Sequence, residues 1–581
     1  IVYHHCAGCH RPGQSAPFPL LTYADAQKRA RDILKVTANG LMPPWLPDPG
    51  ELKFAEERRL TQRELDLISQ WVEQGAIEGR LDDLPPLPKW NDDWQLGKPD
   101  LVVQMNETYT LPADGRDLYR NFVIPIPVQM PRFVRAVEIR PGNTRVVHHA
   151  VLQIDRTSTS RQLDNQDPEP GYGEGMSFGT AQIPDGHFLG WTPGKAPYAG
   201  RADLAWRLSP ETDFVLQLHM RPSGKPEPIR ASIALYFTER EPANFPYALV
   251  LRSKEIDIPA GESNYRVQKE FELPVAVELL SVYPHAHYLG KDLQARATLP
   301  DGTQIQLLRI RDWDFNWQDD YRYARPVFLP AGSKISMDYL FDNSPANFRN
   351  PNQPPRRVSY GRNSTDEMAE LLLQVLPATA EAREVLRRIA AREALLEDIA
   401  QHERRLTSTP GDARTHRILV NRYFQLGEPD QALEHFRRAS QIEPPSAQAL
   451  HAVADALAET GRLDAAREFF EAALHLDPNM APALNGLAQV LSMHPDPTKR
   501  NARNAIELAQ KAVELTKQQD PSALETLAFA YAVDGQSTLT LATAEKAIAL
   551  AQRQGNQPLA DRIRQRLTHF QQSLSPPAQP R

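Results

Sequence analysis

The first residues that could carry chemistry are Cys6, Cys9 and His10, in the sequence Cys6-Ala7-Gly8-Cys9-His10. Two thiols at this spacing can each form a thioether to a vinyl group of a porphyrin, and the adjacent histidine can then bind the iron. The motif uses both cysteines of the 581-residue chain. A chance pair of cysteines or a small disulfide would give the same spacing, but the histidine in register favours a covalently bound haem c.

Five histidines in the middle of the chain lie in patterns that metal binding explains better than packing. His148 and His149 are adjacent within an apolar run, where neighbouring strand side chains point to opposite faces. Both could reach one metal ion only where the backbone twists or bulges, or at a sheet edge. His219 ends a second apolar run, and His285 and His287 place two imidazoles on one strand face. The spacing alone leaves zinc and copper both open.

The order of these motifs resembles the copper type II, ascorbate-dependent monooxygenases, over about residues 100–375. This family includes the peptidylglycine α-hydroxylating and dopamine β-hydroxylating enzymes. The motifs that carry the resemblance are His148-His149, Leu216-Gln217-Leu218-His219, His285-Ala286-His287-Tyr288-Leu289-Gly290-Lys291 and Ser364-Thr365-Asp366-Glu367-Met368.

The resemblance implies two copper ions, each held by one β-sandwich domain, on either side of a solvent cleft. The electron-transfer copper would be bound by His148, His149 and His219. The oxygen-activating copper would be bound by His285, His287 and Met368. Three imidazoles hold both Cu(I) and Cu(II), whereas two imidazoles and a thioether favour Cu(I), the state that meets O2. Met337 competes as the sulfur ligand, and the Asp-Glu-Met match favours Met368.

The chain also departs from that family in its substrate pocket. The arginine that holds the substrate carboxylate in the peptide-amidating enzymes corresponds to Tyr283, and their aromatic and amide residues correspond to Leu372 and Glu370. A glycine-extended peptide is therefore not the expected substrate. The family's disulfides are absent, because both cysteines belong to the haem motif. Gln217, two residues before His219, is either a residue that orients groups in the cleft or a surface glutamine at a strand edge.

Short apolar runs, broken by proline and glycine every few residues, are typical of antiparallel strands in the region that carries these motifs. They predict two jelly-roll-like β-sandwich domains, at 99–240 and 241–378, with a seam near 239–246. From about residue 366 the composition becomes rich in Ala, Leu, Glu and Arg, which favours helix. A connecting helix is expected at 379–410.

Residues 1–82 are predicted to form a small all-α domain around the haem motif. An amphipathic stretch covers 22–38, and a helix is expected over 61–75 with a capping box at its start. The combination with Met42-Pro43-Pro44-Trp45 and with Trp71-Val72-Glu73-Gln74-Gly75-Ala76 resembles small bacterial c-type cytochrome domains. That resemblance implies Met42 as the sixth haem ligand, since a thioether suits iron(II). Residues 83–98 read as a linker on the surface of its neighbours.

Residues 411–575 carry an internal repeat. The segments 411–444 and 445–478 align at a period of 34 residues, each with a helix, a glycine turn, a second helix and a closing proline. Alanines at 432 and 465 are taken as equivalent. This is the tetratricopeptide pattern of an α-solenoid, and 479–516 and 521–555 are expected to be degenerate units. Such a solenoid can bind a protein partner, or can serve self-association or packing.

The composition limits the classes of partner that the protein can bind. A net charge of −7 gives no support for nucleic acid binding, and no apolar run is long enough for a transmembrane segment. A haem c is attached outside the cytoplasm, so we expect an exported protein of the periplasm or the extracellular space. The chain starts at Ile1 without a signal peptide, five residues before the motif, and upstream residues are expected to be missing.

Together these features predict a copper-dependent monooxygenase that hydroxylates a C–H bond with O2. Electrons would come from a small reductant or redox protein and enter through the haem. The organic substrate is not defined by the sequence. The alternatives are an electron-transfer or copper-binding protein with a tetratricopeptide docking arm, and a zinc-binding structural sandwich.

Overall fold

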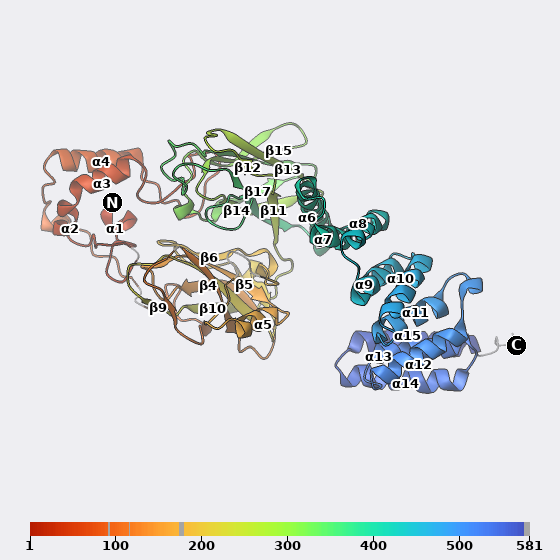
Figure 1. Cartoon of the computed structure of the whole chain (residues 1–581). Coiled ribbons are helices and arrows are strands. Elements are labelled where there is room, and N and C mark those ends of the chain that lie inside the picture. Colours follow the sequence, from red (N-terminus) through yellow and green to blue (C-terminus); the bar gives the residue numbers. More distant parts are fainter. Residues whose placement is uncertain (15, 91–92, 116, 174–178, 575–581) are drawn as a thin grey trace. The chain divides into compact units, whose positions relative to one another are not determined.

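The structure is a computed structural model that describes the whole chain except residues 15, 91–92, 116, 174–178 and 575–581. It divides into two compact units, 1–394 and 395–581. Figure 1 shows the helices and strands of each. The β-rich first unit and the helical repeats of the second agree with the sequence-based prediction.

The first unit begins with a small helical part. Its helices are α1 (Val2–His5), α2 (Tyr23–Lys28), α3 (Ala30–Ala38) and α4 (Gln62–Glu73), followed by the short 3-10 helix η1 (Leu81–Asp83). The predicted amphipathic stretch is divided at Arg29, whose backbone leaves the helical region. The predicted capping box of α4 is present, with Thr61 and Glu64 bonding to each other's backbone N–H. Four apolar side chains, Leu20, Ile33, Leu60 and Ile68, form the centre of this part.

The predicted linker lies against the first sandwich. The backbone N–H groups of Gln95 and Leu96 donate to the carboxylate of Glu138 at 2.9 and 3.1 Å. Trp94 is buried and packs with Tyr236. These contacts agree with the prediction of a surface segment that follows its neighbour.

The first β-sandwich consists of two four-stranded antiparallel sheets around one apolar core. One sheet has the order β1 (Leu101–Gln104), β10 (Ser232–Thr238), β4 (Arg132–Arg140) and β7 (Trp206–Leu208). The other has the order β3 (Leu118–Pro125), β8 (Asp213–Met220), β5 (Val147–Asp155) and β6 (Leu189–Trp191). A separate pair joins β2 (Tyr109–Leu111) to β9 (Glu227–Ile229), and the helices are α5 (Thr159–Gln166), η2 (Pro184–Gly186) and η3 (Ala202–Leu204).

The second β-sandwich repeats this design. One sheet has the order β11 (Tyr247–Ser253), β20 (Ala369–Pro377), β14 (Val277–His285) and β17 (Tyr321–Leu329). The other has the order β13 (Tyr265–Glu272), β18 (Lys334–Phe341), β15 (Gly290–Thr298) and β16 (Gln304–Ile310). The remaining elements are β12 (Asp257–Ile258), its partner β19 (Val358–Ser359), and the 3-10 helix η4 (Phe315–Trp317).

Strand β20 corrects the expectation that the chain is helical from about residue 366. Its sequence, Ala-Glu-Leu-Leu-Leu-Gln-Val-Leu-Pro, is rich in helix-forming leucine, yet it pairs with β11 on one side and β14 on the other. Burial between two strands outweighs the intrinsic helix propensity here. The helical region starts only with α6 (Ala380–Ser408).

The second unit is built from antiparallel helix pairs, seen in teal to blue in Figure 1. The pairs are α7 (Ala413–Leu426) with α8 (Pro429–Ile442), α9 (Ala447–Glu459) with α10 (Leu463–Leu476), α11 (Ala481–Met493) with α12 (Ala502–Leu515), and α13 (Pro521–Val533) with α14 (Ser537–Arg553), followed by α15 (Gln557–Leu574). The 3-10 helix η5 (Pro497–Lys499) lies before α12.

Two details of the repeats can be compared with the sequence. Gly427 adopts a left-handed conformation at the end of α7, with φ 84°, which explains the glycine at that turn. The fully buried alanine equivalent to Ala432 is Ala466, not Ala465, which is only partly buried. The period of 34 residues itself leads to Ala466. Within the described residues, no helix is both long enough and apolar enough to cross a membrane.

Candidate metal centres

The three histidines of the first sandwich meet at a β-bulge. Val147 of β5 lies opposite Met220 of β8. The next pair is His149 opposite His219, which leaves His148 as an extra residue between the pairs. A bulge breaks the regular alternation of side chains, and so allows adjacent residues to share a face. The sequence left a twist, a bulge or a sheet edge open as ways for both histidines to reach one ion, and the structure has a bulge.

The three imidazoles converge through the same ring atom. Nδ1 of His149 lies 3.4 Å from Nδ1 of His148 and 3.4 Å from Nδ1 of His219. One ligand atom from each ring lies within 4.8 Å of the others, as at a site for a single metal ion. The other ring nitrogen of His219, Nε2, lies 3.0 Å from Oδ2 of Asp117. A carboxylate at this place fixes the tautomer that presents Nδ1 and makes the ring a stronger ligand.

Burial keeps these rings neutral. It lowers the pKa of His148 to about 3 and the pKa of His149 well below its usual range. It also lowers the pKa of His219, against the opposing effect of the hydrogen bond to Asp117. Burial would raise the pKa of Asp117, but hydrogen bonds from His219 and Arg221 outweigh it and lower that pKa to about 2. Neutral rings beside an ionised carboxylate suit a metal cation, because only an unprotonated nitrogen binds metal.

The second pair of histidines lies at the end of β14, with ring centroids 5.2 Å apart. Nδ1 of His285 is 2.7 Å from Oε1 of Gln318, and Nδ1 of His287 is 3.0 Å from the backbone oxygen of Asp366. Both rings therefore donate through Nδ1–H and keep a lone pair on Nε2. Burial lowers the pKa of both, that of His287 to about 3. Nε2 of His287 is buried without a hydrogen-bond partner among the described residues, as expected for a metal ligand.

A buried carboxylate joins this pair to Met368. Glu367 accepts hydrogen bonds from the backbone N–H of His287, from that of Leu289 at 3.0 Å and from that of Met368 at 2.8 Å. The backbones of His287 and Met368 are thereby held side by side. Burial raises the pKa of Glu367 to about 8, although the three N–H groups favour its ionised form.

Met337 occupies a different place. It lies on β18, in the sheet opposite β14, and is fully buried in the core of the second sandwich. Its neighbours on the adjacent strands are Lys269 and Ala295. The geometry favours Met368 over Met337 as the sulfur donor beside the histidine pair.

A phenyl ring lies between the two histidine sets. Phe315 has ring centroids 6.5 and 6.3 Å from those of His149 and His219 in the first sandwich. Its centroid is 6.3 and 5.4 Å from those of His285 and His287 in the second. The side chain is only 1% exposed. The solvent cleft implied by the resemblance is therefore filled at this point by an aromatic side chain.

The structure contradicts one of the two predicted roles of Gln217, that of a surface glutamine at a strand edge. Gln217 lies on β8, which is a central strand of its sheet, and it is buried rather than exposed at an edge. Its Nε2 donates to Oδ1 of Asn121 on β3 at 3.0 Å. This bond joins neighbouring strands of the sheet. Gln217 shares the strand face of His219, two residues away, and its role in orienting groups near the histidines stays a prediction.

The haem motif borders a cavity of about 920 Å³. Its walls include Cys6, Cys9, His10 and Met42, together with the apolar side chains Phe18, Leu20, Ile33, Val36 and Leu41. Nδ1 of His10 lies 3.1 Å from the backbone oxygen of Phe18, which leaves Nε2 for an iron. Burial raises the pKa of Cys6 to about 11 and also raises the pKa of Cys9, so neither is an activated redox thiol. The size, lining and donors fit a porphyrin.

His148 belongs to the wall of this same cavity, together with Arg221, Asn316 and Trp317. The haem motif and the three-histidine set are therefore neighbours. The sequence predicts both the haem motif and the three-histidine set, but no local sequence pattern indicates that one histidine borders both sites.

Arg58 holds the small helical part against both sandwiches. Its guanidinium donates to the backbone oxygen of Gly194 at 3.2 Å and to Asp319 at 3.1 Å. Gly194 has φ +79°, and a Cβ atom there would come within 2.7 Å of Sγ of Cys9. Only glycine fits this contact between the haem motif and the first sandwich.

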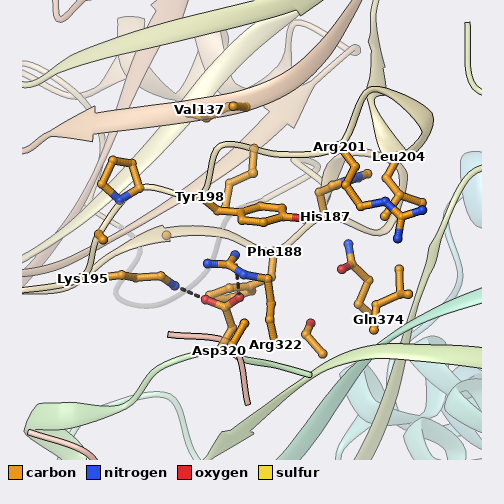
Figure 2. Close-up of a pocket in the computed structure, with 18 of the residues that line it drawn as sticks. Val137, His187, Phe188, Lys195, Tyr198, Arg201, Leu204, Asp320, Arg322 and Gln374 are labelled. Atoms are coloured by element: carbon orange, nitrogen blue, oxygen red, sulfur yellow. Dashed lines mark hydrogen bonds and ion pairs between the residues drawn. The ribbon is translucent and has the colours of Figure 1, made fainter. Parts of the chain in front are cut away.

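A second cavity, of about 300 Å³, lies between the sandwiches. Figure 2 shows Lys195 and Arg322 directed at the carboxylate of Asp320, with the ring of Tyr198 over Arg322. Lys195 also pairs with Asp319 at 2.8 Å. These buried ion pairs connect a loop of the first sandwich to β17 and the residues before it.

The positions that depart from the resembling family are also clear. Tyr283, at the place of the substrate arginine, donates from its hydroxyl to Oε1 of Gln318 at 3.0 Å and stacks on Phe188. Glu370 lies opposite His285 on β20 and pairs with Arg252. Leu372 lies opposite Tyr283. The supporting residues Asp117, Phe315, Gln318 and Glu367 were not predicted as functional.

Comparison with known proteins concerns the second unit. A family model described as tetratricopeptide repeat matches residues 423–491, which confirms the predicted repeats there. A search of the curated proteins gave no match.

Solved structures give short, distant likenesses. MamA is 21% identical and covers 28% of this chain and 93% of its own, with a TM-score of 0.25. PilF of Pseudomonas aeruginosa is 18% identical, covering 31% of this chain and 86% of its own, with a TM-score of 0.24. YrrB, described as a TPR protein with an unusual peptide-binding site, is 16% identical over 32% of this chain and 89% of its own, with a TM-score of 0.25. The assignment of the repeats rests on the family model and the helix pairs.

Proposed function

We propose that residues 1–394 form a copper-dependent monooxygenase whose electrons enter through a covalently bound haem c. The reaction would convert R–H, O2, two electrons and two protons into R–OH and water. The single observation that carries the proposal is the position of His148. Its imidazole belongs to a three-histidine metal set and also borders the cavity of the Cys6–His10 motif.

The two donor sets differ in the way that this reaction requires. Copper, when bound, would supply one-electron redox chemistry at both sets and O2 activation at the second. His148, His149 and His219 offer three neutral imidazoles, a set that accommodates both oxidation states. His285 and His287, with the adjacent thioether of Met368, favour the reduced ion. Nε2 of His287 is buried without a hydrogen-bond partner among the described residues, which supports metal binding at the second set.

The haem cavity supports an electron inlet at the first set. His10 and Met42 line it as candidate axial ligands, and Cys6 and Cys9 line it as candidate attachment points. The external reductant would be a small reductant or a redox protein. Because thioether attachment of haem takes place outside the cytoplasm, this proposal includes a periplasmic or extracellular location.

The second unit serves a different role. Tetratricopeptide repeats present extended surfaces for protein contacts, so this part is a protein-interaction arm. We propose that it docks a protein partner or a second copy of this chain.

The test uses the full chain loaded with haem and copper, and two matched substitutions. Met368→Leu and Met337→Leu both remove a thioether while nearly preserving volume, a change that costs less than about 1.5 kcal/mol in a core. The reduced protein is mixed with isotopically labelled O2 and a small-molecule extract of cells, and both O2 uptake and labelled products are measured. We expect Met368→Leu to stop both with an unchanged haem spectrum, and Met337→Leu to retain both.

Normal turnover by Met368→Leu would contradict the assignment of the oxygen-activating set. A wild-type chain that binds copper and haem but neither consumes O2 nor forms labelled product would instead be an electron-transfer or copper-binding protein. Zinc in place of copper would favour a structural role.

A further inference from the structure

One short turn of the second sandwich contacts all three candidate redox sites. The turn comprises Phe315, Asn316, Trp317 and Gln318, at and just after η4. We infer that this turn is the element that couples the haem cavity and the two histidine sets. The inference rests on the proposed function, and concerns positioning residues that neither the sequence nor the resemblance indicated.

Phe315 makes the contact between the histidine sets. Its ring touches two imidazoles of each set, at the centroid distances of 5.4 to 6.5 Å given above. It also lies against Tyr288, with ring centroids 4.8 Å apart, and the hydroxyl of Tyr288 accepts a hydrogen bond from the guanidinium of Arg221 at 3.2 Å. A buried ring at this position excludes water from the space between the sets. Charge moving between them therefore passes a packed apolar group rather than a solvent gap.

The next two residues reach the haem cavity. Asn316 and Trp317 line it, as does His148 of the first histidine set. The turn thus forms part of the cavity wall to which the first histidine set also contributes. A change in this wall is expected to alter the environment of the haem cavity and of the first histidine set.

Gln318 acts on the second histidine set. Its Oε1 accepts from Nδ1 of His285 at 2.7 Å and from the hydroxyl of Tyr283 at 3.0 Å. The side chain is 3% exposed. Because the amide oxygen can only accept, it requires His285 to carry its proton on Nδ1 and to present Nε2.

The turn is held in place by its own hydrogen bonds. Oδ1 of Asp314 accepts from the backbone N–H of Asn316 at 2.9 Å and from its side-chain amide at 2.8 Å. The backbone N–H of Trp317 donates to the backbone oxygen of Asp314 at 3.0 Å. Arg349 lies 3.9 Å from the other carboxylate oxygen of Asp314. These bonds hold Phe315, Asn316, Trp317 and Gln318 in place before any substrate binds.

The coupling is by single electrons. Cys6, Cys9, His10 and Met42 would hold the haem, which as electron donor would lose one electron for each electron transferred. His148, His149 and His219 would hold a copper ion that carries this electron, and His285, His287 and Met368 would hold the copper ion that accepts it. No bond forms or breaks in either transfer, and the external reductant returns an electron to the haem.

The first experiment compares Phe315→Leu with Phe271→Leu in the full chain. Phe271 is a buried phenylalanine of β13 in the same sandwich, outside both histidine sets, so it controls for lost packing. Haem and copper contents are measured, and electron transfer is followed by stopped-flow absorbance and by the Cu(II) resonance signals after anaerobic reduction. Phe315→Leu is expected to keep both cofactors and to slow transfer between the coppers by about tenfold or more. Phe271→Leu should match wild type.

The second experiment addresses Gln318. Gln318→Leu removes the acceptor behind His285, and is expected to change the resonance signal of the second copper while the signal of the first stays as in wild type. Gln318→Glu keeps an acceptor at this place and should restore the wild-type signal. A purely structural role for Gln318 would leave the signal of the second copper unchanged in both variants.

The outcomes separate the two proposals. If the chain binds haem and two coppers but Phe315→Leu transfers electrons as fast as Phe271→Leu, the coupling role of the turn is wrong and the proposed function stands. If the chain binds no copper, the proposed function fails and this inference fails with it.

Discussion

The two sandwiches hold their histidines in similar places but present opposite ring nitrogens. In the first, His219 lies on the central strand β8. The carboxylate of Asp117 accepts a hydrogen bond from Nε2–H of His219, so Nδ1 faces the other imidazoles. In the second, His287 follows the central strand β14. The backbone oxygen of Asp366 accepts a hydrogen bond from Nδ1–H of His287, and Nε2 has no hydrogen-bond partner among the described residues. The strand supplies the position of a ring, and the acceptor behind the ring selects its ligand atom.

This difference has a chemical consequence. The first set has an ionised carboxylate behind one ring, which strengthens a ligand and suits an ion that changes oxidation state. The second set has neutral acceptors, Gln318 and a backbone oxygen, behind its rings and a thioether beside them. It therefore favours the lower charge of Cu(I). Under the proposed function, the same architecture would therefore hold two copper ions with different tasks.

The largest expected effect comes from making the two sets alike. Met368→His would give the second set three imidazoles, which stabilise Cu(II) as the first set does. We expect copper to remain bound and O2 uptake to fall by about a hundredfold, as when a reacting centre loses its geometry. Copper content and O2 uptake are measured together. Full activity in this variant would mean that the thioether does not distinguish the sets.

An intermediate effect is expected when the carboxylate behind the first set is neutralised. Asp117→Asn should weaken copper binding at the first set by about 10- to 100-fold, the usual effect of losing such a partner. Competition titration with a chelator would resolve the two sites. Asp257→Asn, which breaks a pair with Arg357 in the second sandwich, is the control and should leave both affinities unchanged. Equal weakening at both sites would contradict the separate roles of the two sets.

The smallest effect concerns a tyrosine beside each set. The ring of Tyr119 stacks on His219 at 4.2 Å, and its hydroxyl is buried without a partner in the described part of the chain. The hydroxyl of Tyr283 donates to Gln318. We expect Tyr119→Phe to leave the free energy of unfolding unchanged or raise it slightly, and Tyr283→Phe to lower it by about 1 kcal/mol. Denaturant unfolding of the loaded protein measures both, and the reverse order would contradict this view.

The sequence contained enough to predict the histidine sets but not their support. The adjacent pair His148 and His149 required a twist, a bulge or a sheet edge to reach one ion, and the structure has a bulge. The choice of Met368 over Met337 came from a motif and agrees with the contact made by Glu367. Phe315 and Gln318 gave no such signal, because they lie in an irregular turn where neither strand nor helix periodicity applies.

Three other differences between the prediction and the structure have simple causes. Strand β20 was expected to be helical because leucine-rich runs satisfy both periodicities, and only pairing with β11 and β14 decides between them. The equivalence of Ala465 with Ala432 was off by one residue, which a strict count of the 34-residue period would have shown. Gln217 was placed on the correct strand, but its partner Asn121 comes from a strand 96 residues away along the chain, beyond the reach of local patterns.

The central claim is that residues 1–394 hold one covalent haem and two copper ions. The most direct measurement is elemental analysis of the purified full chain, combined with a haem assay after acid extraction. The account predicts two coppers for each chain and a haem that stays with the protein through the extraction. Zinc in place of copper, or a haem that is released by the acid, would contradict it.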